Sequence, residues 1–419
     1  MKRFLPGFRV IVVLGLAVVI LLTALRVSPW RAYEATCLLL DFRSLNAPAA
    51  SRRASPMMRS PIAYDVDGRS YRGDVYRPID PPLAAVVLLH GAAPLGKDDA
   101  RLVSFAAIFA RARFLVLVPD LVNMRQLKLR ASLVEEITDA VLHMTSSPKL
   151  APQGRLGIIA LSVAAGPSLL AARQLEVRDR IAFILTIGSY YDMPATLNFF
   201  TTGFFMDGGE WHHRAPNRYG KWAFVLSNVD LLSSPSDRRV LSTIAWRKLK
   251  DADAEVSTLA KRLGDEGAAV YRFAANTDRE RTNALLAGLP TAVRSEMRAL
   301  SLSQVTLSPI RGRIIVVHGV DDPIVPYTES IALANALPVA QTRLFLIQGL
   351  LHVDLEPTPL DYWRLWRAGY TLLRERDSLA QETKAQALST RSLNESPART
   401  ANSLAFSLPA SARTRPTCS

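Results

Sequence analysis

Residues 156–166 read LGIIALSVAAG, a short apolar run that meets a serine and then a series of small residues. Apolar residues that follow one another without alternation are typical of a strand buried on both faces of a sheet, which predicts a strand at 156–160. The residues from 163 to 173 have helical spacing, so Ser162 falls on a tight strand-to-helix turn. Such a turn lifts the serine hydroxyl above the edge of the sheet and directs the positive end of the helix dipole toward it.

The same kind of apolar run recurs along the chain, and each run ends in turn-forming residues. The runs that predict further buried strands are 84–89, 114–118, 181–187, 313–317 and 343–347. Segments with helical spacing lie between them, at 98–112, 132–144, 328–337 and 361–374. Strands that alternate with helices predict the α/β class, with a mostly parallel sheet flanked by helices.

One folded domain is expected at 61–375, and it begins with a hairpin. A two-stranded ribbon is predicted at 62–66 and 70–76, because the Asp67-Gly68 dipeptide between them is typical of two-residue hairpin turns. The residues after 376 are rich in Ser, Ala, Thr, Arg and Pro, which predicts a disordered tail at 376–419.

A long insertion interrupts the alternation of strands and helices at 192–309. It is far longer than the roughly 12 to 15 residues that a structureless loop reaches in a compact domain, so we expect an inserted cap. Its second half has helical periodicity, which predicts a mostly helical cap. Its first half contains five large aromatic residues that we expect on the underside of the cap, namely Phe199, Phe200, Phe204, Phe205 and Trp211.

Reactive groups of a parallel sheet gather in the loops that follow the carboxyl ends of its strands. The predicted strand at 84–89 runs into His90-Gly91-Ala92-Ala93, where small side chains let a backbone N–H approach a substrate oxygen. We therefore expect the N–H groups of Ala92 and Val163 to form an oxyanion hole. His90 itself is expected to pack or to hydrogen-bond locally.

Two further motifs follow the last two predicted strands. One reads HGVDDPIVP at 318–326, and the other reads GLLH at 349–352. The patterns H-G-x-x-D-x-x-V-P and G-x-x-H resemble the acid and histidine loops of the α/β-hydrolase family, and the order of strands and helices over 61–374 is similar to that family's as well.

This resemblance implies an α/β-hydrolase fold with a serine nucleophile, an acid and a histidine in that order along the chain. On the matching positions, Ser162 is the nucleophile, Asp322 the acid and His352 the base. The strand-to-helix turn at Ser162, which we call the elbow, departs from the family's G-x-S-x-G pattern, because Ala160 and Ala164 stand where that pattern has glycine. Alanine still meets the physical requirement for a small side chain there, while the alternative for Ser162 is a helix-capping serine.

The other candidate residues have less favourable positions. Asp321, next to Asp322, is expected to be a turn residue, and Asp192 is expected to begin the cap. Among the six histidines only His352 follows the last predicted strand. The adjacent pair His212 and His213 has no acidic or cysteine neighbour at metal-ligand spacing, so no metal site is predicted.

Composition narrows the possible partners. The net charge of +14 is spread along the chain without a Lys/Arg-rich run or a nucleic-acid-binding motif, so we expect no nucleic-acid partner. The two cysteines indicate neither a disulfide framework nor a metal site. No dinucleotide, phosphate-loop or zinc-protease motif occurs, and no cofactor is expected.

The N-terminus carries a membrane-insertion pattern. Three basic residues precede an unbroken apolar run at 10–25, which Arg26 closes. We expect an uncleaved single-pass anchor within 1–27 rather than a cleaved signal peptide, because no convincing cleavage site follows. Under the positive-inside tendency the hydrolase domain is then extracytoplasmic. Residues 28–60 are expected to be a juxtamembrane linker.

These features predict a membrane-anchored serine hydrolase that cleaves a small-molecule or lipid ester or thioester through an acyl-enzyme. A peptidase or a dienelactone-type hydrolase belongs to the same chemistry and remains open. The alternative from a different class is a catalytically silent α/β-hydrolase scaffold that binds an acyl ligand or a membrane partner. A third alternative is a protein that binds anionic lipid through its basic surface.

Overall fold

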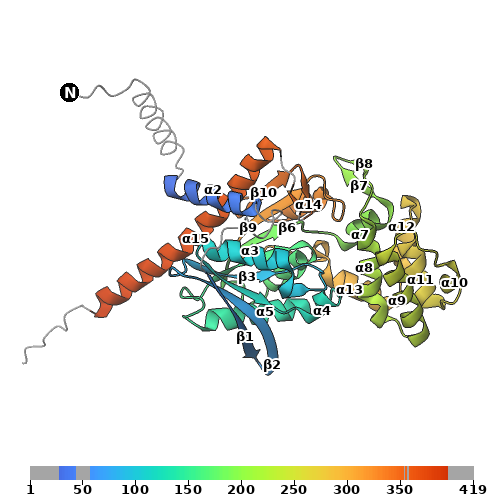
Figure 1. Cartoon of the computed structure of the whole chain (residues 1–419), viewed down its shortest axis with the longest axis horizontal. Helices are drawn as coiled ribbons and strands as arrows, with labels where there is room; N and C mark the ends of the chain where they lie inside the picture. The colour runs from blue at the N-terminus through green and yellow to red at the C-terminus, as the bar shows by residue number, and fades with distance from the viewer. Residues whose placement is uncertain (1–27, 44–56, 353, 356–357, 395–419) are drawn as a thin grey trace, which may run out of the picture.

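The computed structural model describes residues 28–43, 57–352, 354–355 and 358–394 (Figure 1). Its centre is an eight-stranded sheet with the order β1-β2-β4-β3-β5-β6-β9-β10. The first two strands and β4 pair antiparallel, and all the other neighbours in the sheet pair parallel. The strands are β1 (Met57–Val66), β2 (Arg69–Pro78), β3 (Ala84–Leu89), β4 (Phe114–Pro119), β5 (Leu156–Leu161), β6 (Ile181–Ile187), β9 (Arg313–Gly319) and β10 (Thr342–Ile347).

Helices cover both faces of the sheet, as the fully buried central strands require. One face packs against α5 (Leu133–Ser146), α6 (Ala165–Ala171) and α14 (Tyr327–Ala336). The other face packs against α2 (Pro29–Arg43), α3 (Ala100–Arg111) and α15 (Pro359–Asn394). The predicted α/β class, with a mostly parallel sheet flanked by helices, is therefore confirmed.

The predicted hairpin at the start of the domain is also present. Asp67 and Gly68 form its turn with φ angles of 48° and 80°, and a turn with two positive φ angles matches the twist of the strands it joins. The first strand begins at Met57, four residues before the expected start of the domain at Pro61.

The expected linker at 28–60 is wrong for residues 29–43, which form the helix α2. This helix buries Ala35 and Leu38 against the rest of the protein. Its contacts with α15 are made by residues distant in sequence: the indole N–H of Trp366 donates to the carbonyl of Ala32 at 3.3 Å. The sequence of residues 28–60 predicted a linker because α15, the partner helix of α2, lies more than 300 residues further along the chain.

The expected disordered tail is wrong for residues 376–394, because α15 continues to Asn394. Arg376 is 1% exposed, and its guanidinium donates to the carboxylate of Glu34 and to the carbonyl of Ala112. Leu379 is buried as well. The segment also contains three alanines, three leucines and two glutamines, which favour helices. Residues 395–419 lie outside the described part of the chain.

Between β6 and β9 the chain forms a second layer of helices with its own core (Figure 1). Its elements are α7 (Met193–Thr202), β7 (Phe204–Asp207), β8 (Glu210–His213), α8 (Arg218–Asn228), α9 (Pro235–Lys250), α10 (Ser257–Ala260), α11 (Asp265–Ala274), α12 (Arg279–Ala287) and α13 (Thr291–Leu300). We call these elements the cap. Phe199, Phe200 and Phe205 are buried in the cap core, whereas Trp211 is exposed on the short β7–β8 hairpin. That hairpin did not emerge from the sequence.

The apolar run at 10–25 lies outside the described residues, and its membrane prediction stays a prediction. Within the described ranges, every helix is too short or too polar to cross a bilayer.

Candidate active site

The strand-to-helix turn after β5 places Ser162 in a strained backbone conformation. Its φ is 55°, a value that non-glycine residues adopt only where the surrounding structure enforces it. A single 3-10 turn, Ser162–Ala164, follows and leads into α6. On the neighbouring loop, a Cβ at Gly91 would lie 3.0 Å from the Cβ of Ser162, so glycine lets this loop approach the serine closely.

The two alanines at the elbow are fully buried, and the structure accommodates them. The position that excludes a side chain is Gly166, where a Cβ would meet the hydroxyl of Tyr190 at 2.1 Å. The departure of Ala160 and Ala164 from the family pattern therefore leaves the turn intact.

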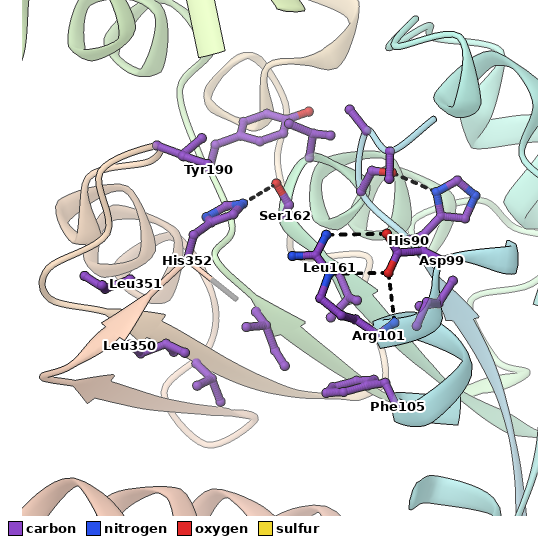
Figure 2. Close-up of a pocket in the computed structure, with 18 of the residues that line it drawn as sticks. His90, Asp99, Arg101, Phe105, Leu161, Ser162, Tyr190, Leu350, Leu351 and His352 are labelled. Atoms are coloured by element: carbon purple, nitrogen blue, oxygen red, sulfur yellow. Dashed lines mark hydrogen bonds and ion pairs between the residues drawn. The ribbon is translucent and has the colours of Figure 1, made fainter. Parts of the chain in front are cut away.

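Ser162, His352 and Asp322 come together at the carboxyl ends of the parallel strands (Figure 2 shows the first two). The Nε2 of His352 lies 2.8 Å from the Oγ of Ser162, and its Nδ1 lies 2.7 Å from the Oδ2 of Asp322. The serine follows β5, the aspartate follows β9 and the histidine follows β10. The three residues that the sequence singled out thus form one continuous hydrogen-bonded chain.

Asp322 is held as a buried carboxylate. Its side chain is fully buried, and its Oδ1 accepts the amide N–H groups of Ile324 at 2.7 Å and Val325 at 3.0 Å. Burial by itself would raise the pKa of Asp322, but the adjacent His352 and the hydrogen bonds from His318 and His352 outweigh it and hold that pKa well below its usual range. The carboxylate therefore accepts a hydrogen bond from the Nδ1–H of His352.

Asp321 takes a different part. Its Oδ2 accepts the amide of Gly349 at 3.2 Å, and its side chain is 45% exposed beside Arg214. This carboxylate holds the start of the histidine loop in place and makes no contact with His352 among the interactions of the described residues. Asp192, the other alternative acid, caps α7 through the amide of Ala195.

Two glycines allow the histidine loop to come close to the sheet. A Cβ at Gly319 would collide with the carbonyl oxygen of Leu350 at 1.7 Å, so glycine at the end of β9 lets β11 (Leu350–Leu351) pass. A Cβ at Gly188 would lie 3.1 Å from the imidazole of His352. His352 has a φ of 62° in the turn between β11 and β12 (Asp354–Leu355). The loop geometry aims the imidazole at Ser162.

Sequence reasoning missed the contact between His318 and Asp322. His318 is fully buried, and its Nε2 lies 2.9 Å from the carbonyl oxygen of Val325 and 3.3 Å from the Oδ2 of Asp322. Its Nδ1 lies 2.6 Å from the Oγ of Ser330. Because Nε2 faces two oxygens, it carries the proton and Nδ1 accepts from the serine hydroxyl. The only signal in the sequence was a histidine four residues before the acid.

The predicted oxyanion-hole residues Ala92 and Val163 both line the cavity that contains Ser162. His90, beside Ala92, is buried, and its Nδ1 lies 2.7 Å from the carbonyl oxygen of Gly91. Burial lowers the pKa of His90, so the ring is neutral and Nδ1–H donates to that carbonyl. The local structural role expected for His90 is confirmed.

The cavity around Ser162 has a volume of about 990 Å³, at the upper end of the range of small-molecule sites. It is lined mainly by apolar side chains. The only carboxylate and guanidinium among its described lining residues belong to Asp99 and Arg101, which bind each other at 3.3 Å (Figure 2). The space around the nucleophile is therefore suited to a neutral, apolar molecule.

No protein-family model and no curated protein matches the chain. Among solved structures it is similar to 2,6-dihydroxy-pseudo-oxynicotine hydrolase, at 15% identity over 79% of this chain and 68% of that one, with a TM-score of 0.39. It is also similar to the esterase domain of a Rhodothermus marinus protein, at 11% identity, 76% and 97% coverage and a TM-score of 0.38. A third similar structure is dienelactone hydrolase from Anabaena variabilis, at 13% identity, 75% and 96% coverage and a TM-score of 0.38.

These scores are low, so the assignment of the fold rests on the molecule itself. An eight-stranded sheet with the second strand antiparallel carries a serine at a strained elbow after β5. An acid after β9 and a histidine after β10 complete the arrangement in the chain order Ser, Asp, His. By this topology and this placement of the three residues, the chain has an α/β-hydrolase fold.

Proposed function

We propose that this protein is a serine hydrolase that cleaves a carboxylic ester or thioester through an acyl-enzyme on Ser162. The observation that carries the proposal is the hydrogen-bonded chain from the Oγ of Ser162 through His352 to Asp322, with distances of 2.8 and 2.7 Å. Distances of this size are those required of a nucleophile and its base.

The first half of the reaction follows from the protonation states. Since Nδ1 of His352 donates to the Asp322 carboxylate, Nε2 holds the lone pair and accepts the hydroxyl proton of Ser162. The oxygen of Ser162 then attacks the carbonyl carbon, and Asp322 stabilises the imidazolium that forms. The amides of Ala92 and Val163 are the proposed donors to the oxyanion.

Collapse of the tetrahedral intermediate breaks the bond between the carbonyl carbon and the leaving oxygen or sulfur, which takes the proton from Nε2 of His352. A water molecule then gives a proton to the same nitrogen and attacks the acyl group on Ser162. The carboxylic acid leaves, and the serine regains its proton. The apolar cavity favours an ester over a peptide, because a peptide would bury unpaired amide groups in it.

Labelling with a fluorophosphonate tests the activated serine directly. We expect the wild-type protein to be labelled and to hydrolyse p-nitrophenyl butyrate, and we expect Ser162→Ala and His352→Ala to lose both properties. Ser378→Ala, at an exposed position of α15, is the matched control and should behave as wild type. Folded wild-type protein that is neither labelled nor active would favour the silent scaffold instead.

We further propose that residues 1–27 tether the hydrolase to a membrane, as the apolar run at 10–25 predicts. Alkaline carbonate extraction of membranes from cells that express the full chain tests this idea. The protein should remain in the membrane pellet, whereas its release into the supernatant would exclude a spanning anchor.

A further inference from the structure

The cavity extends in two directions from Ser162. One direction lies under the cap, where Met193 and Leu197 of α7 and Phe224 of α8 line it. The other lies between three helices that pack on one face of the sheet, and we call it the helix arm. The residues that define the helix arm are Leu38 and Phe42 of α2, Phe105 and Phe109 of α3, and Ala368 and Leu372 of α15.

The two directions belong to different parts of the molecule. The lining residues under the cap pack in or against the cap core, whereas those of the helix arm, apart from Leu38, pack in or against the core between the sheet and the helices α2, α3 and α15. Figure 2 shows Tyr190 on one side of Ser162 and Phe105 on the other. Ser162 and His352 therefore lie between two apolar spaces, and a molecule that reaches both must pass the nucleophile.

The strand ends connect the helix arm with the nucleophile. Leu161 immediately precedes Ser162, and Leu350 and Leu351 immediately precede His352; all three line the cavity. The Asp99–Arg101 pair also lines the cavity, and its two opposite charges pair with each other. A hydrocarbon chain that leaves the reacting carbonyl on this side meets leucine and phenylalanine side chains, with the Asp99–Arg101 pair also in the lining.

The whole cavity, at about 990 Å³, is large enough to hold a small molecule. Interiors are packed as densely as organic crystals and contain few voids larger than a water molecule. Hydrocarbon is the ligand that gains most from such a space, since each buried methylene contributes about 0.8 kcal/mol. A charged or strongly hydrated group would lose its hydration there without gaining a partner.

We propose that the helix arm binds a hydrocarbon chain of the substrate, and that the enzyme acts on neutral esters with an apolar chain on each side of the reacting carbonyl. One chain lies under the cap and the other in the helix arm. The proposal rests on the serine-hydrolase function above and narrows its substrate class. Hydrolysis breaks the acyl C–O bond and adds water, so that one carboxylic acid and one alcohol are released.

A variant that fills the helix arm tests the proposal. Ala368→Trp places a large ring between α15 and the sheet, far along the arm from Ser162. We expect kcat/KM for octyl octanoate to fall at least tenfold, while kcat/KM for ethyl acetate stays within about twofold of wild type. Ser378→Trp introduces the same residue at an exposed position of the same helix and should change neither value. Equal losses on both esters, or no loss on either, would overturn the proposal.

A binding measurement that needs no catalysis separates this proposal from the proposed function. Photolysis of 4-octyloxybenzophenone bound to Ser162→Ala should cross-link to peptides from α2, α3 or α15, and Ala368→Trp in the same background should abolish these cross-links. Cross-links confined to the cap would exclude the helix arm. Cross-links in the helix arm of a protein whose wild type hydrolyses no ester would instead refute the hydrolase and leave the chain-binding site standing.

Discussion

Two of the charged side chains that this molecule buries, Asp322 and Arg376, lie in contrasting surroundings. At the strand ends, the carboxylate of Asp322 meets two backbone amides and two imidazoles. Between α2 and α15, the guanidinium of Arg376 meets the carboxylates of Glu34 and Asp377 and a carbonyl. The first charge is surrounded by strained backbone, with positive φ at Ser162 and His352, while the second joins two regular helices.

The difference distinguishes buried charges that act in the reaction from buried charges that stabilise the fold. A buried charge next to strained backbone and a nucleophile orients a reacting group, and it should matter for the rate. A buried charge between regular helices only satisfies its partners, and it should matter for folding. Substitutions at the two sites should therefore affect different measurements.

Asp322→Asn is expected to have the largest effect. The amide keeps the shape of the side chain but favours the wrong tautomer of His352, so kcat should fall by about 10⁴ while the folded structure persists. Hydrolysis of p-nitrophenyl butyrate measures the loss, and thermal unfolding checks the fold. A variant with near wild-type kcat would show that another group orients His352.

Arg376→Met should have the opposite pattern. Removal of the guanidinium takes away the partner of Glu34, while Asp377 keeps Arg31 at 2.7 Å, and should lower the free energy of unfolding by about 3 kcal/mol. Urea denaturation gives this value, and kcat for a short ester should stay unchanged. If the activity fell while the unfolding free energy did not, the division between the two regions would be wrong.

Glu329→Gln tests a third buried charge, at the point where the cap begins. The carboxylate accepts the amides of Tyr191 at 2.9 Å and Asp192 at 2.6 Å, and burial raises its pKa to about 7. At pH values between the ordinary pKa of a glutamate and about 7, the folded state binds more protons than the unfolded state. Stability from this group is therefore present at pH 4 and is lost as the pH rises to 7, by about 3 kcal/mol.

The glutamine variant keeps an oxygen for the two amides and removes the titration. Its free energy of unfolding should fall less than that of wild type between pH 5 and pH 8, as urea denaturation at several pH values will show. Identical pH dependence in the two proteins would mean that Glu329 remains ionised throughout.

His318→Ala is expected to have the smallest effect, about tenfold on kcat, because it removes only one of the contacts that hold Asp322. His318→Gln retains an N–H that can reach Val325 and should restore part of the rate. The pH profile of kcat should shift in the alanine variant, since the surroundings of the Asp322–His352 pair change. Loss of stability without a change in this profile would assign His318 to packing alone.

The sequence predicted most of the sheet and brought the right residues to its edge. Buried parallel strands appear in the sequence as short apolar runs, and the predicted strands therefore end within two residues of the observed ones. The loops with Ser162, Asp322 and His352 could be recognised because their signals are local: a serine between small residues, and an acid and a histidine at fixed distances from strand ends.

The parts that could not be predicted depend on partners far away in the sequence. Neither α2 nor the end of α15 has a strong apolar pattern of its own, and Arg376 in isolation indicates a surface position. Contacts between the two segments, such as that of Arg376 with Glu34, show that they pack together. His318 was missed for a similar reason, because its contact with Asp322 depends on how the loop after β9 folds back.

The pairing of α2 with α15 also sets when the cavity around Ser162 can close during synthesis of the protein. The helix arm has one wall from near the start of the chain and another from near its end. The sheet, the cap and Ser162 all emerge from the ribosome before α15 does, because chains are made from the N-terminus. The nascent protein can therefore close the cavity around Ser162 only after α15 has been translated, so products that end before α15 would carry the nucleophile without this wall.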